Sequence, residues 1–248
     1  MKALKITLLF LVILSFASCK VTEDIYINED GSGKFLVNLD ASDMMEMTPK
    51  DSLATDVGKQ VDSTFTFQKF FEDNKDSIAK LSPREKERIE KLKRFSVNMK
   101  VNSAENVFKF SMFTDFKTVV DLQDGITSLN DLNRLNRGKT ELSILDMGSF
   151  DANKTIVRYS YVGKKFTRKA QILDFIKTKP VDTINDSSFK MITEASVYIL
   201  KYHFPRKVKK VSNSTAKFSE DRKTITIEFP LNEYIENPKK LDLDVEFE

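Results

Sequence analysis

Apolar and polar residues alternate with a period of two in several stretches of the chain, which is the pattern of half-buried β-strands. Residues 25–27 and 35–39 alternate in this way around the turn Glu29-Asp30-Gly31-Ser32-Gly33, so they predict a β-hairpin. Residues 95–101 and 108–112 predict a second antiparallel pair. Polar residues at every second position favour antiparallel sheets in which one face contacts solvent.

The last part of the chain repeats the strand pattern. Residues 155–161 and 197–204 alternate, and shorter stretches near 208–211, 216–218 and 225–229 follow with turns between them. The chain ends in a strict alternation of apolar and acidic residues, Leu241-Asp242-Leu243-Asp244-Val245-Glu246-Phe247-Glu248. This ending predicts a half-buried strand with an acidic outer face, and such charges keep an edge strand from pairing with other chains.

Helical periodicity occurs between the predicted strand pairs. Apolar side chains over residues 65–81 recur at helical spacing, and Ser82-Pro83-Arg84-Glu85 has a cap residue, a first-turn proline and a glutamate three positions after the cap. We also expect a helix over residues 117–136 and one or two helices within 164–195. Because the helices do not alternate regularly with the strands, the pattern predicts an α+β fold, a largely antiparallel sheet with helices packed on one face.

The first residues have the three parts of a secretory signal. Lys2 and Lys5 are basic, residues 6–14 are apolar apart from one threonine, and Ala17-Ser18 precedes Cys19. A helix needs about 20 apolar residues to cross a bilayer, and this run is shorter. We therefore expect a cleaved leader and not a permanent transmembrane helix.

Cys19 is the only cysteine among the 248 residues. Residues 14–19 resemble the bacterial lipobox, in which the cysteine thiol forms a thioether to diacylglycerol, although Phe16 stands where leucine is usual. The resemblance implies lipidation at Cys19, with palmitate or similar acyl chains, a signal peptide over 1–18 and a lipoprotein domain over 19–248. An alternative divides that domain near residues 140–165. Stable anchoring in a membrane needs more than one acyl chain, and several acyl chains on Cys19 would meet that requirement.

Charge and composition limit the chemistry of the mature chain. Removing Lys2 and Lys5 from the 40 basic residues leaves 38 against 37 acidic residues, so a nucleic-acid binder is disfavoured. His203 is the single histidine, which excludes zinc sites built on several histidines, and a Ser-His-Asp triad would have to use it. No glycine-rich phosphate loop occurs. We expect a structural or surface role for His203, no metal or other cofactor, and no enzymatic activity.

Three charged segments have an alternative interpretation. Asp242, Asp244 and Glu246 could hold a metal ion if a neighbouring strand added oxygen ligands, although a solubilising strand face is the expected role. Residues 28–31 could be a calcium loop, but they lack EF-hand spacing and a plain hairpin turn is expected. The basic residues of segment 201–210 could contact anionic lipid headgroups or form a solvated turn.

Residues 14–19, the hairpin segment 23–33 and the segment 202–208 together are similar to the uncharacterised envelope lipoproteins of Bacteroidetes-type bacteria. The resemblance implies a membrane protein of the cell envelope, and Lys20 after the cysteine favours the outer membrane. From the residues we expect a non-enzymatic binding or structural module whose partner is an envelope protein or a lipid. One alternative is a carrier of an apolar or lipid ligand in a pocket lined by some of the 20 phenylalanines. A less favoured alternative is a carboxylate-based hydrolase.

Overall fold

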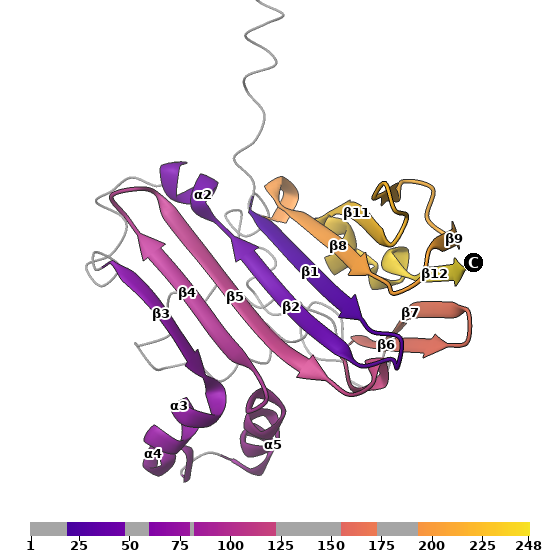
Figure 1. The fold of residues 1–248 in the computed structure, drawn as a ribbon. Helices are drawn as coiled ribbons and strands as arrows, with labels where there is room; N and C mark the ends of the chain where they lie inside the picture. Colours follow the sequence, from indigo (N-terminus) through magenta and orange to yellow (C-terminus); the bar gives the residue numbers. More distant parts are fainter. Residues whose placement is uncertain (1–18, 48–59, 80–81, 123–154, 173–192) are drawn as a thin grey trace, which may run out of the picture.

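The computed structural model describes residues 19–47, 60–79, 82–122, 155–172 and 193–248, which form two β-sheets with a few short helices (Figure 1). The larger sheet has eight strands in the order β10-β11-β8-β1-β2-β5-β4-β3, and the smaller has four in the order β6-β7-β12-β9. Neighbouring strands are antiparallel except β1 and β8, which are parallel. The β1–β8 pair therefore joins the N-terminal strands of the large sheet to its C-terminal strands.

The strands differ widely in length. The large sheet contains β1 (Lys20–Ile27), β2 (Gly33–Asp40), β3 (Val61–Thr66), β4 (Ser96–Asn102), β5 (Val107–Phe116), β8 (Val197–His203), β10 (Lys217–Phe218) and β11 (Thr224–Pro230). The small sheet contains β6 (Thr155–Val162), β7 (Lys165–Ile172), β9 (Val208–Val211) and β12 (Leu243–Phe247).

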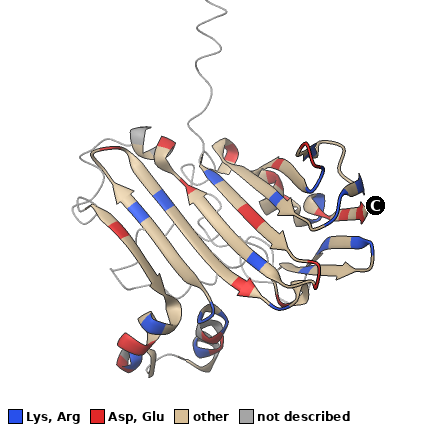
Figure 2. Cartoon of the chain, in the orientation of Figure 1, with Lys and Arg blue, Asp and Glu red and all other residues tan. Residues whose placement is uncertain are grey.

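The large sheet has a buried inner face and an open outer face. On β1 the inward residues Val21, Ile25 and Ile27 are buried, whereas Lys20 and Tyr26 point outward and are exposed. The same alternation continues on the neighbouring strands β2, β5, β8 and β11. Figure 2 shows basic and acidic residues scattered over the outer face, which no other element among the described residues covers.

The small sheet covers the inner face of the large sheet beneath β1 and β8. Phe166 of β7 is fully buried, and its ring lies 5.4 Å from that of Tyr202 on β8 and 5.3 Å from that of Phe204. Tyr159 of β6 also contacts the large sheet, through a hydrogen bond to Glu23 of β1. Burying aromatic side chains between two sheets is the main source of stability in such a packing.

The expected α+β fold is wrong, because the described chain is mostly β and the partner of the large sheet is a second sheet. The described helices are short: α2 (Ser42–Met47), α3 (Phe67–Asp73), α4 (Lys75–Ala79), α5 (Pro83–Leu92) and α8 (Leu231–Glu236), with 3-10 turns at Val119–Asp121 and Pro238–Leu241. Helices α3, α4 and α5 lie together beyond the end of β3 and β4, beside the sheet edge (Figure 1). None of the described helices combines the length and the apolar character needed to cross a bilayer.

A buried arginine explains why strand β7 was not predicted from the sequence. We expected helices within 164–195, but residues 165–172 form β7, and residues 173–192 lie outside the described residues. The inward positions of β7 are Phe166, Arg168 and Ala170, all buried. Because an arginine interrupts the apolar set, the period-two pattern is hidden in the sequence.

The other predicted elements have mixed outcomes. The first hairpin is confirmed as β1–β2, the second pair as β4–β5, and the helix starting at Pro83 as α5. Within the predicted helix over 65–81, Thr66 ends strand β3 and caps α3 through its hydroxyl, so the helix begins only at Phe67. The predicted helix over 117–136 is a 3-10 turn at Val119–Asp121, and residues 123–136 lie outside the described residues.

The C-terminal strand is half-buried, as predicted, but it is not at an edge. Strand β12 pairs with β7 on one side and with β9 on the other. Its inward residues Leu243, Val245 and Phe247 are buried, and its acidic residues face outward. The charges therefore do not protect a sheet edge, because paired strands occupy both sides.

Candidate functional site

Strand β1 has two consecutive carboxylates, Glu23 and Asp24. Because side chains alternate along a strand, Glu23 points between the two sheets and Asp24 points to the outer face. Both residues are buried, with exposed fractions of 0% and 8%. Each carboxylate organises a polar cluster, and these two clusters are the most developed polar sites among the described residues.

The Glu23 cluster consists of one carboxylate, one guanidinium and three phenols, contributed by Glu23, Tyr159, Arg168, Tyr198 and Tyr202. The hydroxyls of Tyr159 and Tyr202 donate to Glu23 Oε1 at 2.7 and 2.5 Å, and that of Tyr198 donates to Oε2 at 2.6 Å. Arg168 Nε lies 3.7 Å from Glu23 Oε1, and its Nη1 donates to the carbonyl of Leu241 at 3.2 Å. Glu23 thus receives hydrogen bonds from three phenols and an ion pair from Arg168.

The strand registers bring these side chains together. Tyr198 and Tyr202 are four residues apart on β8, so they point to the same face beside β1. Tyr159 and Arg168 are direct partners in the β6–β7 pairing. The cluster is therefore made from two adjacent strands of each sheet, and it connects the two sheets across their interface.

Burial and charge act against one another on the ionisable groups of the Glu23 cluster. Burial alone disfavours a charged guanidinium, but the oxygens of Tyr159 and Glu23 prevail and hold the pKa of Arg168 well above its ordinary value. Burial and the negative charge of Glu23 raise the pKa of Tyr202 well above that of an ordinary tyrosine. The cluster thus holds a charged arginine and a protonated phenol around one carboxylate.

Two nitrogens of the buried guanidinium have no hydrogen-bond acceptor among the described residues. These are Nε, which only forms the 3.7 Å ion pair, and Nη2. All side chains of the cluster are nearly or fully inaccessible to solvent. A substrate cannot reach such a cluster without separating the sheets, so its present geometry suits an internal connection and not a catalytic centre.

The His203 cluster lies on the outer face and consists of Asp24, Tyr26, His203 and Thr224. His203 Nε2 lies 2.9 Å from Asp24 Oδ1, and Nδ1 lies 2.9 Å from Thr224 Oγ1. The ring of Tyr26 stacks on the imidazole, with 4.0 Å between centroids and 3° between planes. An ionised carboxylate only accepts hydrogen bonds, so Nε2 is the donor to Asp24, whereas the Thr224 hydroxyl can donate to Nδ1 or accept from it.

The order Asp24–His203–Thr224 has the groups of an acid–base–nucleophile relay, but the backbone N–H of Thr224 is not available as an oxyanion-hole donor. The backbone N–H of Thr224 donates to Ser219 Oγ at 2.9 Å, and its carbonyl accepts from Ser219 N at 3.0 Å. These groups are therefore occupied and do not form an oxyanion hole beside the hydroxyl. The described contacts hold His203 between two strands, β1 and β11.

Described residues line at least two surface cavities. One of about 400 Å³ lies between α3, α4 and α5, with Phe71 and Ile78 in its wall and lysines at its rim. The other, of about 280 Å³, lies where turns of both sheets meet, and its lining residues are Glu29, Asp30, Gly31, Thr118, Val119, Tyr161, Gly163 and Arg206. Neither cavity includes His203 or a residue of the Glu23 cluster.

Part of the phenylalanine excess forms a packed aromatic cluster. Phe65, Phe67, Phe70 and Phe71 contact one another, with ring centroids between 5.5 and 5.9 Å apart. Phe67 and Phe71 are buried. These four rings therefore contribute to the core, and only Phe71 also lines the cavity between the helices.

Cys19, the predicted lipidation site, directly precedes β1. Its side chain is buried with 1% exposed, and its carbonyl accepts a hydrogen bond from Val197 N at 2.9 Å. Burial, reinforced by the charge of Asp40 and opposed by a hydrogen bond with Ser196, raises the pKa of the Cys19 thiol to about 12. The free thiol of the folded chain is therefore protonated at neutral pH.

The carboxylates of the last strand, considered above as an alternative metal site, contact lysines and backbone of β7. Asp244 bridges Lys165 at 2.9 Å and Lys169 at 2.6 Å, and Asp242 Oδ1 accepts from the Ala170 backbone at 2.7 Å. The two lysines and their hydrogen bonds lower the pKa of Asp244. The described part of the chain contains no group of three acidic, histidine or cysteine residues arranged to hold a metal ion.

Residues of the other two charged segments make contacts within the fold. The turn at residues 28–31 is a hairpin turn in which Asp30 Oδ1 accepts from the backbone and hydroxyl of Ser32, at 2.9 and 2.6 Å. The basic segment divides between the two sheets, because Lys201 lies on β8 and Lys209 and Lys210 lie on β9. Arg206, between these strands, pairs with Glu29.

Sequence reasoning missed the Glu23 cluster, although one signal was present. Glu23 stands at an inward position of β1, between the buried Val21 and Ile25. A charged residue at an apolar position of a strand indicates a buried partner. Nothing in the local sequence identifies that partner as Arg168, which lies on another sheet.

The comparisons with known proteins add little to this geometry. No protein-family model matches the chain, and no curated protein matches it significantly. Among solved structures, the folded domain of the Mycobacterium tuberculosis LppM protein is similar with a TM-score of 0.37 and 12% sequence identity, covering 94% of this chain and 91% of that one. A similarity at this level supports no argument about fold or function.

Proposed function

We propose that this chain is a lipid-anchored protein of the bacterial envelope whose β domain lies directly against the membrane and acts by binding and not by catalysis. The observation that carries the proposal is the position of Cys19. The predicted lipid attachment site is hydrogen-bonded to Val197 at the end of the large sheet, one residue before β1. No linker separates the anchor from the folded domain.

Acylation of Cys19 has to precede the docking of β1. The thiolate, and not the thiol, is the nucleophile in thioether formation. Because burial raises the pKa of Cys19 to about 12, the folded chain holds almost no thiolate at neutral pH. The enzyme that transfers diacylglycerol would therefore act on the unfolded chain at the membrane, and the acylated side chain would then remain outside the core.

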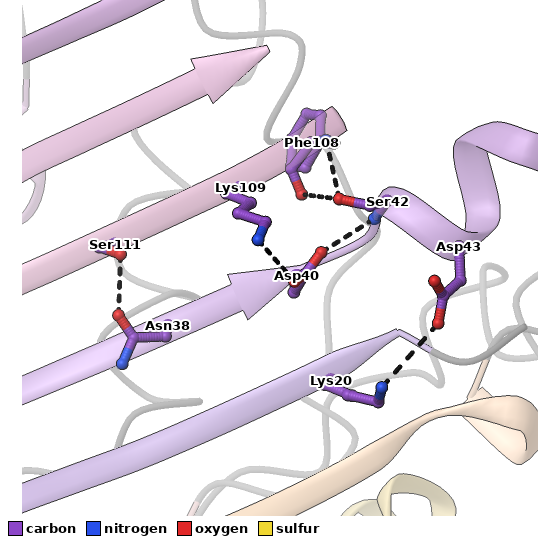
Figure 3. A network of polar contacts seen from close by, with 8 residues as sticks. All are labelled: Lys20, Asn38, Asp40, Ser42, Asp43, Phe108, Lys109 and Ser111. Carbon is purple, nitrogen blue, oxygen red and sulfur yellow. Dashed lines mark hydrogen bonds and ion pairs between the residues drawn. The ribbon is translucent and has the colours of Figure 1, made fainter. Parts of the chain in front are cut away.

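The surface around Cys19 favours anchoring by lipid over anchoring by charge. Lys20 lies 3.9 Å from Asp43, and Lys109 lies 3.5 Å from Asp40 (Figure 3). These two lysines near Cys19 are thus each matched by an aspartate. An anionic membrane surface attracts each unpaired basic residue near it by about 1 kcal/mol. A surface whose lysines are already paired with aspartates gains little from this attraction.

A binding role is supported because the described polar clusters are inaccessible to solvent or already engaged in contacts within the fold. The Glu23 cluster is inaccessible, His203 is held by Asp24 and Thr224, and Asp242 and Asp244 are engaged within the small sheet. We therefore propose a non-enzymatic module with an envelope protein or lipid as its partner. Lys20 after the cysteine favours the outer membrane, and the similarity to Bacteroidetes-type lipoproteins stays a prediction.

The test replaces the attachment residue in the full chain. Cys19→Ser should move the protein from the membrane fraction to the soluble fraction or leave the leader uncleaved, with a mature mass that lacks acyl chains. Ser15→Ala, which changes the leader and keeps the cysteine, is the matched control and should fractionate as the wild type. Unchanged membrane association and mass of the Cys19→Ser protein would refute the lipid anchor.

A further inference from the structure

The cavity formed by the turns lies at the opposite end of β1 from Cys19. Strand β1 has eight residues, so its two ends are about 26 Å apart. The lining comes from four turns: β1–β2, the segment after β5, β6–β7 and β8–β9. Loops supported by two packed sheets are a common place for binding sites. In a protein anchored at Cys19, this cavity would face away from the membrane.

A single arginine holds the two sheets together at this cavity. Arg206 Nε lies 3.3 Å from Glu29 Oε2, and its Nη1 donates to the carbonyl of Gly163 at 3.3 Å. Its third nitrogen, Nη2, has no hydrogen-bond partner among the described residues. The guanidinium is therefore fixed in place while one donor nitrogen stays available.

A phenol in the cavity wall has no partner. The hydroxyl of Tyr161 is inaccessible to solvent and makes no hydrogen bond with the described residues. Burial raises the pKa of Tyr161, Arg206 lowers it and Glu29 raises it, so the phenol lies within the field of both charges. A buried hydroxyl without a partner costs about 1–3 kcal/mol, and a ligand that accepts its hydrogen bond would remove that cost.

The cavity also has negative groups. Asp30 is ionised at neutral pH, because its hydrogen bonds with Ser32 lower the pKa of its carboxyl. Glu29 and Asp30 together outnumber the single positive charge of Arg206 in the lining. A simple anion would be repelled by these carboxylates, and a simple cation would leave the donors of Arg206 and Tyr161 unused.

We propose that this cavity binds a small zwitterion of the amino-acid type, a free amino acid or the end of a short peptide. Its carboxylate would accept from Arg206 Nη2 and, once the Tyr161 side chain turns toward the cavity, from the Tyr161 hydroxyl, and its ammonium group would face Glu29 and Asp30. The volume of about 280 Å³ is close to the lower end of the range for small-molecule sites, about 300 Å³. The inference deepens the proposed binding role by naming a ligand class, and it does not depend on acylation.

The test measures binding of the dipeptide alanyl-alanine to the full chain, purified in detergent, by titration calorimetry. The N-acetylated dipeptide, the dipeptide amide and phosphoethanolamine are the comparison ligands. The dipeptide should bind, and blocking either of its charged ends should weaken binding about tenfold or more, because each end loses a charge-assisted hydrogen bond. Equal binding of the blocked forms, tighter binding of phosphoethanolamine or absence of binding at millimolar concentration would each overturn the assignment.

Two variants separate binding from folding. Tyr161→Phe should weaken dipeptide binding about tenfold and leave the melting temperature unchanged or higher, because the lost hydroxyl had no partner in the protein. Arg206→Gln should weaken binding at least as much. Lys207→Gln removes the same charge from the neighbouring exposed residue, outside the cavity lining, and should bind as the wild type does.

The variant results also separate this inference from the proposed function. Wild-type binding by Tyr161→Phe, or equal losses in Arg206→Gln and Lys207→Gln, would show that the cavity is not the site. Such a result would leave membrane attachment through Cys19 unaffected, since the two ends of β1 are tested independently.

Discussion

The two faces of β1 give consecutive carboxylates opposite environments. Glu23 is fully buried between the sheets with three phenols and a guanidinium, whereas Asp24 contacts His203 on the outer face. The Glu23 cluster has no exposed member, while Tyr26 of the His203 cluster is 41% exposed. The same type of side chain thus connects two sheets at one position and two neighbouring strands of a single sheet at the next.

The comparison teaches that burial, and not the residue type, decides how strongly a charged group is coupled to the fold. An ion pair in a low-dielectric interior becomes very costly when one partner is removed, because the remaining charge has lost its solvent and its partner. Near the surface, water replaces a lost partner and the cost is small. The predictions below test this difference from the largest expected effect to the smallest.

Glu23→Gln should produce the largest loss of stability. The glutamine keeps the size of the side chain but leaves Arg168 as an unpaired buried charge, which costs about 3–5 kcal/mol in similar cases. Urea unfolding followed by circular dichroism measures the free energy of unfolding. The double variant Glu23→Gln/Arg168→Met removes both charges and should recover part of the loss. A single variant as stable as the wild type would contradict the role of the cluster.

Cys19, also on the inner face, should make the unacylated chain sensitive to alkaline pH. The thiol pKa is raised from 9.0 to about 12 in the folded state, so above pH 9 the unfolded chain loses a proton that the folded chain keeps. Stability attributable to this group is therefore fully present below pH 9 and declines as pH rises, by about 1.4 kcal/mol per pH unit.

The measurement compares residues 19–248, produced without the leader, with the Cys19→Ala variant. The difference in the free energy of unfolding between the two proteins should shrink between pH 9 and 10. Other groups that titrate in this range are common to both proteins and cancel in the difference. A constant difference over this range would show that the thiol is accessible and not buried against Ser196.

Asp24→Asn should have the smallest effect. The substitution removes a charge from the outer face but leaves an amide oxygen that can still accept from His203 Nε2. The expected loss is about 1 kcal/mol or less, because the hydrogen bond is kept and the His203 side chain, 23% exposed, contacts solvent, and urea unfolding measures it. A loss as large as that of Glu23→Gln would remove the contrast between the two faces.

Local sequence was sufficient for elements whose pattern is complete within one segment. The β1–β2 hairpin follows from its alternation and its turn residues, and α5 follows from Ser82-Pro83 and Glu85. Local sequence failed for β7, whose inward arginine hides the strand pattern, and for Phe65, which lies in β3 and does not begin a helix. An aromatic run does not by itself distinguish a strand from a helix.

Of the candidate sites, the sequence identified Cys19 and His203 because each is the only residue of its type. It could not identify the Glu23 cluster or the cavity at Arg206. Their residues come from three or more separate strands or turns, and they meet only when the two sheets pack. Chemistry that depends on such long-range contacts has no spacing rule in the sequence.

The sequence by itself therefore determined most of the strand pattern and the shortage of residues for thiol or histidine-based chemistry, and it predicts a leader that ends before Cys19. Only the tertiary structure decided that the inner face of the large sheet is covered by a second sheet and that β1 pairs in parallel with β8. It also decided that Glu23 and Asp24 have different roles. The physical reason is that alternation fixes which face a side chain takes, but packing fixes what that face meets.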